Sequence, residues 1–282
     1  MSALAARSGH SGFRHPSLVV GATLTGLFVF AAALSLVWAP HSPFDIDVPH
    51  KLAAPSPAHW LGTDAFGRDV ASLLLVGAQN SLLVGVVAVA IGLIIGAALG
   101  LLAAAMGGFP EDVVMRLADF AFAFPAVLSA ILLAALFGPS VLDAILAIGV
   151  FNVPVFARVT RAAARGVWRR DFILAARAAG SGTLRISLEH ILPNILPGLT
   201  VQATIQFATA VLAETALSYL GLGTQPPQPS WGRMLNDAQT LMFQAPQLAV
   251  YPGLAIALAV LGLNLLGDGL NDLLDPRLAR TR

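Results

Sequence analysis

The chain has 282 residues, of which 57% are hydrophobic and only 11% are charged, and its formal net charge is +1. A soluble domain of this length would carry far more charge, so the composition excludes an ordinary soluble protein and predicts an integral membrane protein. The chain has no cysteine, which excludes disulfide bonds and thiolate metal sites.

Six stretches of the chain are apolar and long enough to cross a bilayer, which takes about 20 residues as a helix. They predict an all-α, polytopic membrane protein with about six transmembrane helices. In chain order the predicted spans are residues 17–39, 80–106, 117–137, 141–157, 198–220 and 248–267. Because the number is even, both termini are expected on the same side of the membrane.

The basic residues predict that this side is the cytoplasm. Lys and Arg in short loops are retained there, and thirteen of the sixteen basic residues fall on the side of the termini, leaving Lys51, Arg68 and Arg233 on the other. The predicted organisation is a cytoplasmic tail at 1–16, a first span at 17–39, an external loop at 40–79, a core of five spans at 80–268 with a cytoplasmic loop at 158–197, and a cytoplasmic tail at 269–282.

An ordered pair of turns is predicted where the external loop meets the second span. Residues 61–69 read Leu-Gly-Thr-Asp-Ala-Phe-Gly-Arg-Asp. In such a segment Asp64 can accept hydrogen bonds from backbone N–H groups, while Arg68 pairs with an acid. We favour this structural role, and direct contact of Asp64, Arg68 and Asp69 with a transported solute is the alternative.

The most charged part of the chain lies between the fourth and fifth predicted spans. Residues 158–193 carry seven arginines, and such a polar segment cannot lie in hydrocarbon, where unmet hydrogen bonds cost several kcal/mol each. Trp168, Phe172, Ala176 and Ala179 recur at helical spacing. This spacing predicts a short helix with one apolar face that needs a partner.

Residues 171–180 predict a two-turn helix, with Asp171 as its N-cap and Gly180 just past its end. The arginine stripe before it predicts that this helix continues the fourth span. A second short helix is predicted from Thr183 to the residue before Pro193. We expect the two short helices to dock against another protein, with an amphipathic helix on the membrane surface as the alternative.

Within the spans, the sequence marks one packing surface and one polar site. Glycines recur at helical spacing between residues 85 and 100, which predicts close packing of the second span against its neighbours. Glu214 stands inside the fifth span, where an acid is expensive and by default indicates function. Because Ser218 follows one turn later, a hydrogen-bonded structural role is equally open, and both residues remain candidates for the translocation path.

The sequence lacks the motifs of common membrane enzymes. Its single lysine, Lys51, does not follow a glycine, so any ATP must be hydrolysed by another chain. H-E-x-x-H and G-x-S-x-G are also absent. The histidines at positions 41, 50 and 59 are nine residues apart, unlike common metal ligands, so we expect no metal site. We also expect no enzymatic activity, no cofactor bound by this chain and no nucleic-acid partner.

Several of these segments resemble one family of membrane proteins. Ala175-Ala176, Gly180 and Leu192-Pro193 match the cytoplasmic loop of ABC importer permeases, although Leu174 stands where that family usually has Glu. Residues 61–69 look like the G-T-D-x-x-G-R-D element of the dipeptide, oligopeptide and nickel permeases, in the subunit type called the C component. Further segments that resemble this group are residues 115–119, 123–125, 214–223, 264–270 and 274–277.

This resemblance implies the type I ABC importer permease fold, with a cytoplasmic coupling helix that transmits the motion of an ATPase to the pore. It implies a location in the bacterial cytoplasmic (inner) membrane, where the chain forms half of a translocation pathway. The implied partners are a second homologous permease, one or two ABC ATPase subunits that bind ATP and Mg²⁺, an external substrate-binding protein and membrane lipid. The implied coupling contacts are Asp171, Phe172, Ala175, Ala176, Arg177, Ala179 and Gly180.

The resemblance favours di- and oligopeptides as the imported solutes, with nickel or another small solute as the alternative. No residue of the chain argues for peptides. An ion-coupled carrier is a further alternative, and such carriers need ionisable residues at mid-membrane. Glu214 stands almost alone in that respect, so the ABC importer is the favoured interpretation.

Overall fold

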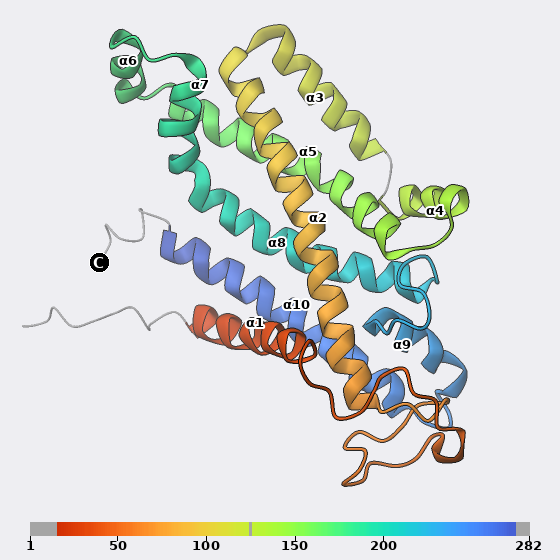
Figure 1. Ribbon diagram of the computed structural model, residues 1–282. Coiled ribbons are helices and arrows are strands. Elements are labelled where there is room, and N and C mark those ends of the chain that lie inside the picture. Colours follow the sequence, from red (N-terminus) through yellow and green to blue (C-terminus); the bar gives the residue numbers. More distant parts are fainter. Residues whose placement is uncertain (1–15, 124–125, 275–282) are drawn as a thin grey trace, which may run out of the picture.

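The computed structural model describes residues 16–123 and 126–274, and their regular structure is helical (Figure 1). The all-α prediction is confirmed. Of the two predicted tails, residues 1–15 and 275–282 lie outside the described residues, while residues 269–274 belong to the last helix. The elements are α1 Pro16–Leu34, η1 Val48–His50, α2 Val70–Met106, α3 Gly108–Ala123, α4 Ala126–Phe137, α5 Val141–Trp168, α6 Asp171–Ala178, α7 Thr183–Ile186, η2 Ser187–Ile191, α8 Leu192–Tyr219, α9 Trp231–Ala238, η3 Gln239–Leu241 and α10 Gln247–Leu274.

Five of the described helical segments are long and apolar enough to cross a membrane, and a bent pair of helices brings the number to six. The bent pair is α3 and α4, which meet at 80°. Two helices therefore take the place of the continuous helix predicted at 117–137, and the pair together can still serve as one span.

Two helices extend further toward the loops than predicted. Helix α2 begins at Val70 rather than near residue 80, so the predicted external loop at 40–79 ends at Asp69. The Asp69 side chain stabilises this earlier start, because it accepts a hydrogen bond of 2.8 Å from the backbone N–H of Ser72. At the other end of the chain α10 continues past the predicted boundary at 267 to Leu274, while α1 stops at Leu34, before the predicted boundary at 39.

Most residues of the predicted cytoplasmic loop at 158–197 are helical in the structure. Helix α5 runs on to Trp168, and a continuous helical run from Thr183 to Tyr219 joins α7, η2 and α8. The predicted stop before Pro193 is wrong because this proline stands at the start of α8, directly after the wider π turn of η2. Only residues 169–182 separate the long helices. The short helix does not continue the fourth span, since Arg170 between them is extended, with φ −83° and ψ 146°.

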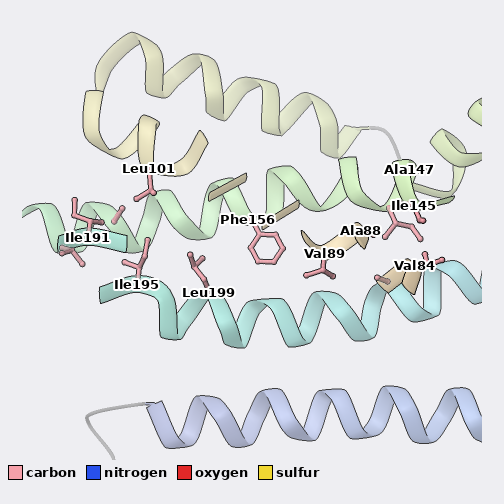
Figure 2. Close-up of a cluster of buried hydrophobic side chains, with 14 of the residues drawn as sticks. Val84, Ala88, Val89, Leu101, Ile145, Ala147, Phe156, Ile191, Ile195 and Leu199 are labelled. Carbon is pink, nitrogen blue, oxygen red and sulfur yellow. The ribbon is translucent and has the colours of Figure 1, made fainter. Parts of the chain in front are cut away.

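The core lies between α2, α5 and α8, as Figure 2 shows for the side chains from Val84 to Leu199. Helices α2 and α5 pack closely because glycines of α2 face the α5 backbone: a Cβ atom on Gly96 would lie 2.5 Å from the carbonyl oxygen of Val153. A Cβ on Gly100 would lie equally close to the carbonyl of Ala157. The prediction that these glycines serve close helix packing is confirmed.

The bundle has two different ends, which lie on opposite sides in Figure 1. We call the end that carries α6 and residues 169–182 the arginine end. We call the end that carries residues 35–69, residues 220–230 and α9 the loop end. Helix α1 begins and α10 ends on the side of the arginine end.

Candidate functional site

Helix α6 lies at the arginine end with one side against the bundle and the other exposed. Ile173 is completely buried and joins the core cluster, and Ala176 packs half-buried beside it. Burying one such aliphatic side chain contributes about 1.5–3 kcal/mol, which holds this short helix in place. The neighbouring Phe172 and Leu174 are exposed by 42% and 55%, and Ala175 is exposed as well. The helix therefore exposes apolar and small side chains.

The face predicted from the sequence is only partly correct. Trp168 and Ala176 turn toward the bundle, but Phe172 and Ala179 are exposed, and the residue that holds the helix is Ile173. The helical spacing of these residues does not describe one helix, because Trp168 belongs to α5 while Phe172 and Ala176 belong to α6. Because Arg169 and Arg170 separate α5 from α6, no single helical face connects Trp168 with Phe172.

The ends of α6 show one prediction to be right and one wrong. Gly180 follows the helix with φ +83°, and its N–H donates to the carbonyl of Arg177 at 2.9 Å. This is the glycine just past the helix end that the sequence predicts. Asp171 is not the N-cap, because it is the first helical residue and Arg170 occupies the cap position without a side-chain hydrogen bond. An acid in the first turn still interacts favourably with the helix dipole.

Several arginines of this region are used inside the chain. Glu111 at the start of α3 is buried, and it accepts hydrogen bonds from Arg161 Nε at 2.6 Å and Arg165 Nη1 at 2.8 Å. Arg158 pairs with Asp119, also of α3. Arg177 of α6 lies over the Trp168 ring at 4.7 Å. These contacts tie α3 and α6 to α5.

At the loop end, the Asp64 carboxylate holds the predicted pair of turns together. Its Oδ1 accepts the backbone N–H groups of Phe66 at 2.8 Å and Arg68 at 2.9 Å. Its Oδ2 accepts Arg68 Nε at 2.7 Å and forms an ion pair with Nη2 of the same side chain at 2.6 Å. The predicted structural contacts of Asp64 and Arg68 are therefore present. Both oxygens of Asp64 are already engaged within the loop.

Arg68 also reaches toward α9, where it meets a second acid. Its Nη2 lies 3.8 Å from Asp237 Oδ2, and Arg233 Nε lies 3.1 Å from Asp237 Oδ1. Burial raises the pKa of Asp237 above its usual range, and the neighbouring charges of Arg233 and Arg68 oppose this shift. The four charges link the turn at 61–69 to α9.

Glu214 and Ser218 come together in α8, as their spacing predicts. Glu214 is buried, and its Oε1 accepts the Ser218 hydroxyl at 2.7 Å and the Thr224 hydroxyl at 3.4 Å. Its other oxygen accepts the Ser81 hydroxyl of α2 at 3.2 Å. Ser218 Oγ in turn accepts the backbone N–H of Thr224 at 2.9 Å. The acid thus joins α8, α2 and the following loop, and both of its oxygens have partners.

Comparison with known proteins connects these features to a family. The model of the binding-protein-dependent transport system inner membrane component matches residues 96–280, about two thirds of the chain. The chain belongs to this permease family.

Curated relatives of the permease extend the match to almost its whole length. The dipeptide transport system permease protein DppC of Alkalihalophilus pseudofirmus is 42% identical over 260 residues, which are 92% of this chain and 86% of the relative. The glutathione transport system permease protein GsiD of Pectobacterium atrosepticum is 40% identical over 262 residues, which are 91% and 87% of the two chains. The di/tripeptide transport system permease protein DppC of Pseudomonas aeruginosa is 41% identical over 273 residues, covering 94% and 90%.

A solved structure supports the fold of the permease. A chain of the inward-facing MetNI methionine ABC transporter superimposes with a TM-score of 0.59 at 20% identity, covering 74% of this permease and 95% of that chain. The predicted ABC importer permease fold is therefore confirmed. At this identity the likeness concerns the fold alone.

Sequence reasoning missed several residues that the structure shows to be central. Glu111 is one, because its partners Arg161 and Arg165 lie 50 and 54 residues further along the chain. Ser81 and Thr224, which hold Glu214, gave no local signal either, because each belongs to a separate segment of the chain. Ile173 was missed because the break between α5 and α6 was not foreseen.

Proposed function

We propose that this permease is a subunit of an ATP-driven, binding-protein-dependent importer of short peptides, and that α6 transmits the motion of an ATPase to the bundle. It works with a second homologous permease, one or two ATPase subunits that bind ATP and Mg²⁺, an external substrate-binding protein and the surrounding lipid. The permease itself supplies no catalytic group and no nucleic-acid contact. It resides in the bacterial cytoplasmic membrane.

The observation that carries this proposal is the exposed side of α6. The helix is held to the core by Ile173, so a force applied to its exposed residues is passed to the core cluster between α2, α5 and α8. Small side chains at Ala175 and Ala179 allow a partner surface to approach closely. Because such a core is tightly packed, α6 and the helices that it contacts are expected to move together rather than deform locally.

The basic residues of the arginine end support an orientation of the permease in the membrane. The arginine end carries Arg169, Arg170 and Arg185 in short segments, and basic residues in such segments are retained in the cytoplasm. We therefore place the arginine end and both termini in the cytoplasm, and the loop end outside.

The peptide substrate is supported by the relatives, whose names specify dipeptides, di/tripeptides and glutathione. Uptake measurements can distinguish peptides from nickel and other small solutes. Uptake of labelled di- and tripeptides, glutathione and Ni²⁺ is compared in cells that express the full transporter with and without this permease. Permease-dependent uptake of peptides alone supports the proposal, and uptake of Ni²⁺ alone contradicts it.

The coupling role is tested by Ala175→Glu, which puts a charge on the exposed side of α6. Enclosing an unpaired carboxylate against a partner is costly. The cost is well above ~1.4 kcal/mol, a difference that already corresponds to a tenfold loss of affinity. We expect at least about a tenfold loss of peptide uptake and loss of ATPase subunits on affinity purification. Ala175 is preferred over two neighbouring positions because Ala176 packs against the bundle and Gly180 needs its positive φ.

The matched control is Ala163→Glu, the same change at an exposed alanine of α5. This variant is expected to keep uptake and ATPase binding. Normal uptake by Ala175→Glu at equal expression would contradict the coupling role of α6, whatever the substrate.

A further inference from the structure

Three side chains of types that can bind a metal meet at the loop end, although each comes from a different part of the segment 41–69. The ligand atoms of His41, His59 and Asp69 all lie within 4.8 Å of one another. His59 Nδ1 lies 3.0 Å and His41 Nδ1 3.7 Å from the same oxygen, Asp69 Oδ1. The two imidazole rings are 4.6 Å apart between their centroids. The nine-residue spacing of the histidines predicted no such site, because it could not show that Asp69 would join two of them.

This group is held in place by a hydrogen-bonded network. Asp69 Oδ2 accepts both the backbone N–H and the hydroxyl of Ser72, each at 2.8 Å, which leaves Oδ1 directed at the histidines. Ser72 Oγ also accepts the backbone N–H of His41 at 3.0 Å. One serine thus positions two of the three side chains. His59 is fixed independently, since its carbonyl accepts the N–H groups of Ser56 at 2.8 Å and Gly62 at 3.0 Å.

We propose that His41, His59 and Asp69 bind a divalent transition-metal ion of the zinc and nickel class. Metal–ligand bonds of about 2.0–2.2 Å place two ligands of one ion about 3.0–3.5 Å apart. The observed distance of 3.0 Å for His59 lies in this range, and that of 3.7 Å for His41 lies slightly above it. Two imidazoles with one carboxylate suit Zn²⁺, Ni²⁺ and Cu²⁺, whereas Ca²⁺ and Mg²⁺ prefer oxygen ligands alone.

The exposure of the three side chains indicates how the ion enters. The Asp69 side chain is 1% exposed, that of His59 21% and that of His41 44%, so the group opens to water at His41. Three protein ligands leave further coordination positions for water or for a donor atom of another molecule. Bound there, the ion links the segment after α1 to the start of α2. This inference does not depend on which solute the permease transports.

A simpler interpretation is an ordinary hydrogen bond between histidine and carboxylate next to a helix cap. The same loop contains such a pair, because His50 Nδ1 lies 2.8 Å from Asp47 Oδ2. No second histidine joins that pair among the described residues. His50 is therefore the matched control for the two proposed ligands.

The proposal is tested on the purified transporter that contains the full permease. Zn²⁺ and Ni²⁺ are titrated in competition with a chromophoric chelator. We expect one ion per permease, with affinity reduced at least about tenfold by His41→Ala and by His59→Ala and unchanged by His50→Ala. Ser72→Ala removes only the hydroxyl that orients the ligands, and such outer-shell changes cost about 10–100-fold in affinity. Asp69 is left intact because it also caps α2.

Two results would overturn the metal site. One is the absence of saturable binding, and the other is binding that His41→Ala and His59→Ala leave unchanged. A second measurement uses the unaltered protein and so avoids any folding defect of the variants. Zn²⁺ should protect His41 and His59 from modification by diethyl pyrocarbonate at least about tenfold while His50 reacts at its usual rate. Equal modification of all three histidines with and without Zn²⁺ would also reject the proposal.

Discussion

The loop end and the arginine end use their polar residues in opposite ways. At the loop end Asp64 and Asp69 are buried, and each directs its oxygens at partners within the chain. Glu214 of α8, which bonds to Thr224 of this end, does the same. At the arginine end α6 keeps one buried contact, at Ile173, and exposes most of its other side chains. The loop end is built as a closed structure, while the arginine end offers a surface. A residue that matches a family motif can therefore be a buried part of the architecture at one end and an exposed surface residue at the other.

The largest difference between the ends is expected at two glycines that share a left-handed conformation. Gly67 at the loop end has φ +79° and Gly180 at the arginine end has φ +83°. A Cβ atom on Gly67 would overlap the backbone carbonyl of Asp47, whereas a Cβ on Gly180 meets nothing within 4 Å. The conformation alone costs another residue about 1–3 kcal/mol, and the overlap adds to this at Gly67 only.

We expect Gly67→Ala to abolish most of the folded permease, and Gly180→Ala to lower its stability by only about 1–3 kcal/mol. Fluorescence-detected size exclusion after heating measures both effects. Equal losses for the two variants would show that the loop end is no more tightly built than the arginine end.

The next largest effect concerns Glu111, a buried and paired acid that resembles those of the loop end. Glu111 is buried between Arg161 and Arg165, which are themselves partly exposed. Removing both arginines leaves a buried carboxylate without its charge partners, a change that costs about 3–5 kcal/mol. Removing the acid leaves only partly exposed arginines, which water can solvate.

The expected order of stability is therefore wild type, then Glu111→Ala, then the double variant Arg161→Ala with Arg165→Ala. Thermal unfolding of the purified permease measures it. Asp119→Asn is the control, because its ion pair with Arg158 is exposed and such pairs contribute about 0–1 kcal/mol. A double variant as stable as Glu111→Ala would place Glu111 in contact with water.

The separation of contacting residues in the sequence explains which parts of the molecule could be predicted. The turn around Asp64 and the glycine after α6 depend on residues within a few positions of one another, and both were predicted correctly. The ion pair of Glu111 with Arg161 joins residues 50 positions apart, and the bond between Ser81 and Glu214 joins residues 133 apart. No local pattern encodes such contacts, because they depend on how whole helices pack.

The apolar spans show the same limit. Hydropathy located the long helices, but it could not locate their ends. Helix α2 starts ten residues early because Asp69 caps it, and α5 continues because its arginines face the acids of α3. Hydropathy also could not foresee the 80° bend between α3 and α4. Capping residues and charge partners decide these boundaries, and hydropathy does not register either of them.

The smallest expected effect belongs to Glu214→Gln, which tests whether the closed structure of the loop end extends into the membrane. The amide oxygen of glutamine can accept the Ser218 and Thr224 hydroxyls, and its NH₂ group can donate to Ser81, whose hydroxyl both donates and accepts. All three contacts can therefore persist, and the change in stability should stay within about 1 kcal/mol. We expect peptide uptake to remain within about twofold of wild type, with an unchanged dependence on external pH.

Glu214→Ala is the matched variant, because it removes the acceptor for three hydroxyl groups in a buried place. Each hydroxyl left without a partner costs about 1–3 kcal/mol, so this variant should lose folded protein where Glu214→Gln does not. An ion-coupled carrier would give a different result. In such a protein the glutamine variant would fold normally but lose proton-dependent uptake, because the amide cannot exchange a proton. Retained uptake with glutamine and lost folding with alanine would together assign Glu214 to the architecture of the permease.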